Sequence, residues 1–194
     1  MSDASLSLAD RAPLYAWLAP LFAREIELDL WEILHKPEIR GLLAGLEPEF
    51  SAWIEDPLGP ERQEECAAEF ARLFLLPGGV PPFASAWMDG NREQLGAKLS
   101  TIVLRSCEVL GRQPERAEPW GNLALDHLAL LLDLTSGAAL SSDPLDQQVA
   151  EHLDGELLGE WIFNFGSALE EKAELPIYRA LGRFLQQLHT DEPA

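Results

Sequence analysis

Apolar residues recur at spacings of three and four along almost the whole chain, which is the period of an α-helix. The first segment, over about residues 5–24, has one apolar stripe made of Leu14, Trp17, Leu18, Leu21 and Phe22. No stretch alternates apolar and polar residues as a half-exposed strand does. The pattern therefore predicts an all-α protein without a sheet.

Further helices are expected at residues 28–36, at two short segments within 38–55, at 60–75, at 93–110 and at about 120–136, followed by two closing helices. The pattern is clearest at 60–75, where two faces separate. One face carries Cys66, Phe70, Leu73 and Phe74, and the other Glu61, Glu65 and Glu69. The closing helices run through Leu157–Leu169 and Tyr178–Leu188. Nine or ten helices are expected, and a length of 194 residues suits one helical bundle domain over 1–194.

Proline and glycine interrupt the helical pattern at two long connections. The stretch LLPGGVPPFASAWMDG after residue 74 excludes a regular helix and leaves Phe83, Trp87 and Met88 on a loop, which must be pinned because it is so apolar. Residues 111–121 hold two prolines and are expected to form a hinge. A further helix is expected to begin near Pro144, with Ser142 or Asp143 as its N-cap.

Composition agrees with a folded globular protein, since 47% of the residues are hydrophobic and 24% are charged. No apolar run approaches the roughly 18 residues that a membrane-spanning helix needs. The N-terminus carries acids where a secretory signal carries bases, so we expect a cytoplasmic protein. Cys66 and Cys107 are expected to be buried as small apolar side chains, without a disulfide or a cysteine metal site.

The charge of the chain is strongly negative, with 14 Lys and Arg against 33 Asp and Glu, a formal net charge of −19. Acids are spread over both halves of the sequence. This balance excludes nucleic acid as the expected partner. The negative charge either keeps the protein soluble or provides a surface that attracts a basic ligand.

No nucleotide, metal or nucleophile motif is present, so neither a cofactor nor catalysis is expected. Asp126-His127 places one of the four histidines directly after an acid. Adjacent residues of a helix point about 100° apart, so the two side chains would not bind one ligand together. Helical spacing instead places His127 at the border of the apolar face, as a buried histidine with a backbone or carboxylate partner. The alternative is a helical enzyme in which His127 is the general base.

Two segments resemble the TorD/DmsD/NarJ family of redox enzyme maturation chaperones. From Phe70 the sequence runs through Leu73-Phe74, a Gly/Pro turn and Pro-Pro-Phe83-Ala-Ser85, as the family pattern does. Asp126-His127 is similar to the family's Asp-His, which follows a Glu-Pro pair. In this sequence six residues separate Pro119 from Asp126, where the family has about one.

The resemblance implies a cytoplasmic chaperone that binds the twin-arginine signal peptide or N-terminal segment of a molybdoenzyme catalytic subunit and delays its export until the cofactor is inserted. Such a ligand joins two guanidinium groups to an apolar stretch, so the expected site combines a carboxylate at the rim with a groove of large apolar side chains. The expected peptide-binding residues are Phe70, Leu73, Phe74, Phe83, Trp87, Asp126 and His127, with Ser85, Glu118 and Pro119 as secondary candidates. We expect a monomer with some dimer formed by domain swapping at the hinge. The other alternative is a helical interaction module unrelated to redox enzymes.

Overall fold

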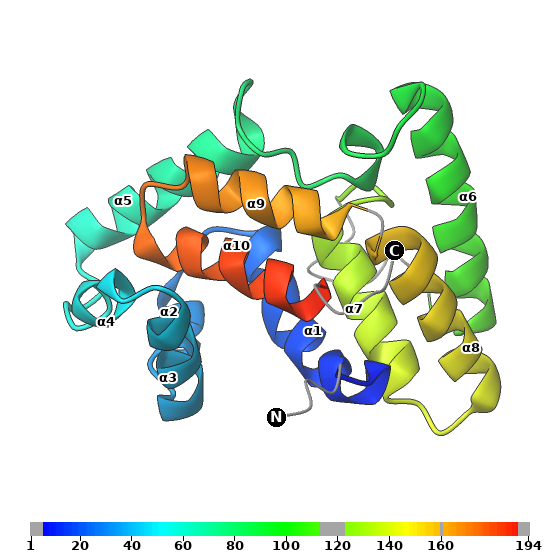
Figure 1. The fold of residues 1–194 in the computed structure, drawn as a ribbon, viewed down its shortest axis with the longest axis horizontal. Helices are drawn as coiled ribbons and strands as arrows, with labels where there is room; N and C mark the ends of the chain where they lie inside the picture. Colours follow the sequence, from blue (N-terminus) through cyan, green and yellow to red (C-terminus); the bar gives the residue numbers. More distant parts are fainter. Residues whose placement is uncertain (1–5, 113–122, 160, 190–194) are drawn as a thin grey trace. The chain divides into compact units, whose positions relative to one another are not determined.

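The fold was analysed in a computed structural model, which describes residues 6–112, 123–159 and 161–189. Ten α-helices, with short 3₁₀ and π segments, make up most of this part of the chain (Figure 1). No strand occurs in it, and a single isolated β-bridge joins Phe83 to His127. The predicted all-α class and the predicted number of helices are confirmed for the described residues.

The chain forms two compact units, each made of separate stretches of sequence. Unit 1 comprises Met1–Ala23, Pro82–Trp161 and Asp191–Ala194, and unit 2 comprises Arg24–Pro81 and Ile162–Thr190. The single domain over residues 1–194 stays a prediction. So does the hinge, because residues 113–121 lie outside the described part of the chain.

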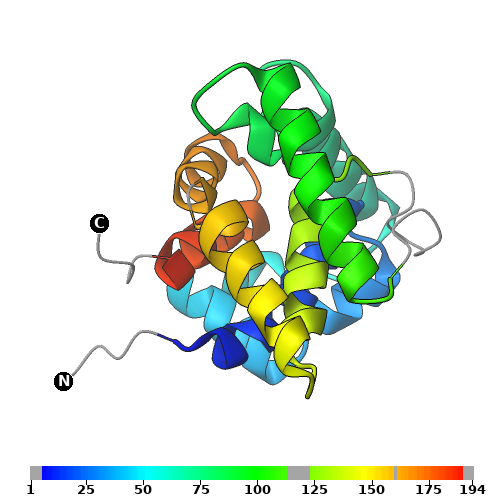
Figure 2. The same cartoon turned by 90° about the vertical axis from the view of Figure 1, so that its right-hand side faces the viewer.

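Unit 1 is built around helix α7 (Leu128–Ala139), which packs along α1 (Leu8–Ala23) and α8 (Pro144–His152). Figure 2 shows this unit with α6 (Arg92–Val109) and α8 toward the viewer. Most of α7 is apolar on every side, and nine of its twelve residues are buried. A helix of that composition is stable only as the centre of a core.

A buried carboxylate joins two helical segments of unit 1. Helix α8 continues into a π-helical turn, η4 (Leu153–Leu158), which carries Asp154. The Tyr15 hydroxyl on α1 donates a hydrogen bond to Asp154 at 2.6 Å, and Arg11 forms an ion pair with the same carboxylate. Asp154 is therefore paired and hydrogen-bonded, as a buried charge must be.

Unit 2 contains α2 (Leu28–Leu34), α3 (Pro37–Leu46), α4 (Glu49–Trp53), α5 (Pro60–Phe70), α9 (Ile162–Lys172) and α10 (Pro176–His189). Helix α5 continues into a π-helical turn, η1 (Ala71–Leu75), so the predicted helix over 60–75 is confirmed with a wider last turn. Helix α10 packs against α9, α3 and α4. Its buried apolar face includes Ile177, Tyr178, Leu181, Phe184, Leu185 and Leu188.

Helices α9 and α10 touch through their backbones at two glycines. A Cβ atom on Gly166 would lie 2.7 Å from the Gly182 carbonyl oxygen, and one on Gly182 would lie 2.6 Å from the Gly166 carbonyl oxygen. Real Cβ contacts are not that short. Larger residues at either position would push the two helices apart.

Several helices begin where the sequence places a cap. Pro144 opens α8, and the Asp143 carboxylate accepts a hydrogen bond from the Leu145 amide at 2.9 Å, so the predicted N-cap is confirmed. Asn91 caps α6 in the same way, accepting from the amides of Glu93 and Gln94 at 3.1 Å each. Cys66 and Cys107 are buried and free, as expected.

The predicted start of the helix at about residue 120 is wrong, because α7 begins at Leu128. The residues just before it pair with a distant segment instead. The Leu128 amide donates to the Pro82 carbonyl at 2.8 Å, and the Ala84 amide donates to the Asp126 carbonyl at 3.0 Å. Apolar periodicity cannot reveal such a pairing, since its partner lies about forty residues away.

The helix expected through Leu157–Leu169 is also interrupted. The π turn η4 ends at Leu158, and α9 begins at Ile162. The Trp161 indole donates a hydrogen bond to the Leu157 carbonyl at 2.5 Å and so satisfies a carbonyl of the last turn of η4. The side chain of Trp161 is fully buried.

Candidate functional site

In unit 1, four predicted site residues meet where the loop after Pro82 pairs with the start of α7. The bridge between Phe83 and His127 holds the two segments together, and the Phe83 and His127 rings meet edge to face with centroids 5.3 Å apart. The Asp126 carboxylate accepts a hydrogen bond from the Ser85 amide at 3.1 Å. Asp126 and His127 therefore hold the loop that carries Phe83 and Ser85.

His127 is the N-cap of α7. Its Nδ1 atom accepts a hydrogen bond from the Ala129 amide at 3.1 Å, so in the neutral ring the proton is on Nε2. Burial lowers the pKa of His127 to about 4, although the neighbouring Asp126 acts in the opposite direction. The histidine is neutral at physiological pH and has a structural partner, which agrees with the interpretation as a buried, satisfied side chain.

Asp126 differs from the exposed rim position that the peptide site was expected to have. Only 6% of its surface is exposed, and Ser85 is buried with it. Phe83 and Trp87, in contrast, are half-buried. Asp126 thus faces the backbone of the loop, while the two aromatic side chains of the same loop are partly accessible.

In unit 2, the other three predicted apolar residues lie in the core. Phe70, Leu73 and Phe74 are 5%, 0% and 6% exposed. Phe74 is 5.1 Å from Phe70 and 5.6 Å from Tyr178, measured between ring centroids. The apolar stripe at 60–75 is therefore packing within the unit, and a contact of these residues with a peptide stays a prediction.

The next two residues, Leu75 and Leu76, are exposed to 66% and 58%. They close η1 and open a tight turn, in which the Val80 amide donates to the Leu73 carbonyl at 2.6 Å and the Leu76 amide to the Ala71 carbonyl at 2.9 Å. We call residues 75–79 the leucine turn. The sequence did not single it out, because Leu75 and Leu76 follow the buried Leu73-Phe74 pair without any change in residue type.

A clamp made of Glu69, Arg72 and Lys172 holds the leucine turn. The Lys172 ammonium donates to the carbonyls of Gly78 and Gly79 at 2.8 and 3.1 Å, and Arg72 donates to the Lys172 carbonyl at 2.7 Å. Arg72 also forms two bonds to the Glu69 carboxylate, at 2.7 and 2.8 Å. The apolar stretch after residue 74 was expected to be held in place by other parts of the protein, and this is confirmed for the leucine turn.

Glu69 departs from the exposed acidic stripe expected for α5, since it is only 5% exposed. Its Oε1 atom accepts hydrogen bonds from the backbone amides of Glu174 and Leu175, at 2.6 and 3.3 Å. Both partners come from the turn between α9 and α10. Their distance in sequence explains why spacing along α5 could not predict the burial of Glu69.

Comparison with known proteins identifies the family. The sequence model described as nitrate reductase delta subunit matches residues 39–165, about two thirds of the chain. The chain belongs to this family. It is also 29% identical over 188 residues to the chaperone protein TorD of Psychrobacter sp. (strain PRwf-1), covering 88% of this chain and 84% of the relative. The chaperone protein TorD of Vibrio vulnificus (strain YJ016) is 28% identical over 200 residues, covering 90% and 89%.

The matched range of the nitrate reductase delta subunit family includes both the Asp126-His127 pair and the leucine turn. The predicted resemblance to TorD-type chaperones is therefore confirmed. The secondary candidates Glu118 and Pro119 also fall in the matched range, but they lie outside the residues that the structure describes.

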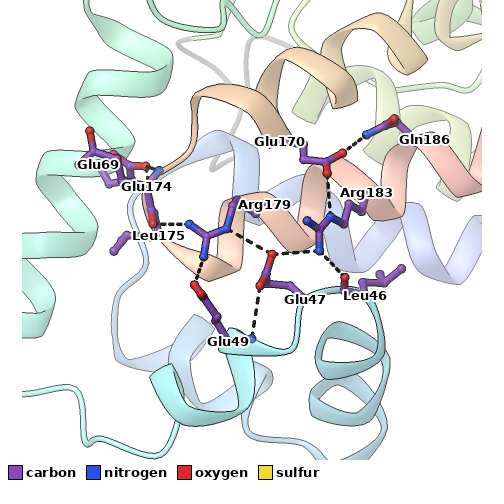
Figure 3. Close-up of polar contacts among 10 residues, drawn as sticks. All are labelled: Leu46, Glu47, Glu49, Glu69, Glu170, Glu174, Leu175, Arg179, Arg183 and Gln186. Carbon is purple, nitrogen blue, oxygen red and sulfur yellow. Dashed lines mark hydrogen bonds and ion pairs between the residues drawn. The ribbon is translucent and has the colours of Figure 1, made fainter.

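This family member also has an ion-pair network on α10, within unit 2 (Figure 3). The buried Glu47 accepts from Arg179 at 3.2 Å and lies 3.0 Å from Arg183. Arg183 also donates to Glu170 at 2.8 Å and to the Leu46 carbonyl at 2.7 Å. The network ties α10 to α9 and to the connection between α3 and α4, so these two arginines serve the fold.

Within residues 6–112, 123–159 and 161–189, no three His, Cys, Asp or Glu side chains are grouped so that they could hold a metal ion. No helix of the same residues is both long and apolar enough to cross a membrane.

Proposed function

We propose that this chain is a maturation chaperone for a molybdenum-containing oxidoreductase. It binds the twin-arginine signal peptide or N-terminal segment of the catalytic subunit and delays its export until the cofactor is inserted. The observation that carries the proposal is the match to proteins named as TorD chaperones, which extends over 84% and 89% of the length of the two relatives described above. Their names agree with the expectation of a chaperone and not an enzyme.

The charge of the chain supports a ligand of this chemistry. A twin-arginine leader presents two guanidinium groups beside an apolar stretch, and the chain has 33 acids against 14 bases. A carboxylate-rich surface attracts such a peptide from a distance and raises its association rate. The chaperone would act in the cytoplasm before export, as a monomer with a minor population of domain-swapped dimer.

The loop from Phe83 to Trp87 is our candidate for part of the peptide contact in unit 1. Its two aromatic side chains are half-buried, and partly accessible aromatic residues are common anchors in binding surfaces. Asp126 would then act on the peptide indirectly, by holding the loop through the Ser85 amide. The same holds for His127, whose ring packs against Phe83.

A genetic experiment tests the proposal. The gene for this chain would be deleted from its host, and the activity and molybdenum content of each exported molybdoenzyme would be measured. We expect one enzyme to lose both, and expression of the intact chain from a plasmid to restore them. Full molybdenum content and activity of every such enzyme in the deletion strain would contradict the proposal.

A further inference from the structure

The leucine turn is an apolar surface that the packing of unit 2 leaves open. Single exposed leucines are ordinary in folded proteins, whereas a consecutive pair at the tip of a turn is not. Leu75 and Leu76 are exposed to 66% and 58%, and the following Pro77 is exposed as well. They directly follow two residues that are fully packed. The chain thus switches from core to apolar surface within a single turn.

The leucine turn is held rigidly. The Lys172 ammonium binds two of its carbonyls, and Arg72 and the buried Glu69 hold Lys172 in turn. The backbone also demands glycine at two positions: Gly78 has a φ of +86°, and a Cβ atom on Gly79 would lie 2.2 Å from the Leu73 carbonyl oxygen. A surface fixed in this way loses little conformational entropy when a ligand binds.

Acidic residues predominate in the two segments of sequence that carry the leucine turn and its clamp. Residues 60–79 and 170–175 contain the acids Glu61, Glu64, Glu65, Glu69, Glu170, Glu171 and Glu174 and the bases Arg62, Arg72 and Lys172. Each base is already engaged: Arg62 with Asp56, Arg72 with Glu69, and Lys172 with backbone carbonyls. Glu171 and Glu174, next to the clamp in sequence, are exposed, and Glu174 lies 3.6 Å from Arg72. With seven acids against three bases, the two segments carry a net negative charge.

We propose that the leucine turn is the docking surface for the apolar stretch of the client's leader, with the surrounding carboxylates facing the basic residues that precede that stretch. This inference rests on the proposed function. It assigns the apolar contact to Leu75 and Leu76, whereas the buried Leu73 and Phe74 position the turn. An apolar segment without basic residues, or an anionic partner, fits this surface less well, because the flanking acids would be desolvated without compensation.

A double-mutant cycle tests the inference, with calorimetry on the full chain and synthetic leader peptides. The protein variant is Leu75→Gln, Leu76→Gln. One peptide variant has its apolar stretch replaced by serine and glycine, and another has both arginines replaced by glutamine. We expect the leucine variant to bind the intact leader roughly ten times more weakly. The binding free energy lost through the leucine variant should not add to the loss caused by replacing the apolar stretch of the peptide, because both changes remove the same contact. It should add to the loss caused by replacing the two arginines, which belong to a separate contact.

The matched control is Leu140→Gln, Leu145→Gln, which removes two leucines of similar exposure, 60% and 53%, from unit 1. Melting temperatures should be alike in all three proteins, since the changed side chains are exposed. Equal loss of affinity in the control and in the leucine variant would overturn the inference. A leucine variant that binds the intact leader as tightly as the unchanged protein would overturn it as well. If the unchanged protein binds no leader at all, the proposed function itself fails.

Discussion

His127 is a buried neutral side chain, and its titration should be visible in the stability of the protein. Its pKa is lowered to about 4 in the folded chain, against about 6.5 for a histidine in an unfolded chain. The unfolded state therefore takes up a proton more readily, and stability is lost as the pH falls from about 6.5 toward 4. Between pH 7 and pH 5 we expect the free energy of unfolding to fall by roughly 2 kcal/mol from this group alone. Urea unfolding at the two pH values measures it.

The control for that prediction is His127→Asn. Asparagine can still accept a hydrogen bond from the Ala129 amide at the N-cap but does not titrate. The variant should be less stable at pH 7, because the edge-to-face contact with Phe83 is lost, and should lose less stability on going to pH 5. An unchanged difference between the two pH values would show that His127 is not the group responsible.

Gly79 is a second residue whose role can be tested by itself. Adding a methyl group at Gly79 would bring a Cβ atom within 2.2 Å of the Leu73 carbonyl oxygen, so Gly79→Ala must displace the backbone of the turn. We expect a loss of about 2 to 3 kcal/mol in the free energy of unfolding, measured by urea titration. Gly41→Ala is the matched control: it lies inside α3 with nothing within 4 Å, so it should stabilise the chain by up to about 1 kcal/mol.

At the scale of elements, the sequence predicts best those helices that have an apolar face opposite a polar face, or a recognisable N-cap residue. The segments at 60–75 and 93–110 and the cap at Asp143 are confirmed, because apolar spacing and caps are local properties. The start of α7 and the break after η4 could not be predicted. Both depend on hydrogen bonds that are not part of the helical pattern, from Leu128 to Pro82 and from the Trp161 indole to Leu157.

The clamp between η1 and the turn from α9 to α10 gives a prediction at the same scale. Glu69→Ala removes the acceptor of two backbone amides and of Arg72 from a site where Glu69 is only 5% exposed. We expect a loss of roughly 2 to 4 kcal/mol in the free energy of unfolding, because the amides are left buried without a partner. Glu64→Ala, on the exposed side of the same helix, should change it by less than about 0.5 kcal/mol. If Glu69→Ala lowered the free energy of unfolding no more than Glu64→Ala, the clamp would not contribute to stability.

At the scale of the whole molecule, the motifs of the candidate site and the burial of His127 could be predicted from the sequence, but the burial of Asp126 could not. Asp126 and His127 were singled out by residue type, and the structure places them beside Phe83 and Ser85. The burial of Asp126 follows from its contact with the Ser85 amide, about forty residues away in the chain. Leu75 and Leu76 have no distinguishing residue type, so their exposure became evident only from the fold.

The net charge of −19 is a property of the whole chain, and it predicts how binding of the leader depends on salt concentration. Exposed ion pairs are screened as ionic strength rises, because the Debye length shortens from about 10 Å at 0.1 M salt to about 3 Å at 1 M. If carboxylates attract the leader, its association rate should fall steeply with added salt, while its dissociation rate changes less. Stopped-flow measurements at several salt concentrations separate the two rates. An association rate that is independent of salt would contradict electrostatic attraction.

We expect this chain to bind the leader of a molybdoenzyme through both the arginines and the apolar stretch of the leader. Titration calorimetry tests this with the leader of the molybdoenzyme that the deletion experiment identifies, using the intact peptide and one with both arginines changed to glutamine. We predict saturable one-to-one binding of the intact peptide and binding at least about tenfold weaker for the changed one, since each charged contact contributes of the order of 1 kcal/mol. No heat of binding with the intact leader, or equal affinity for the two peptides, would contradict this prediction.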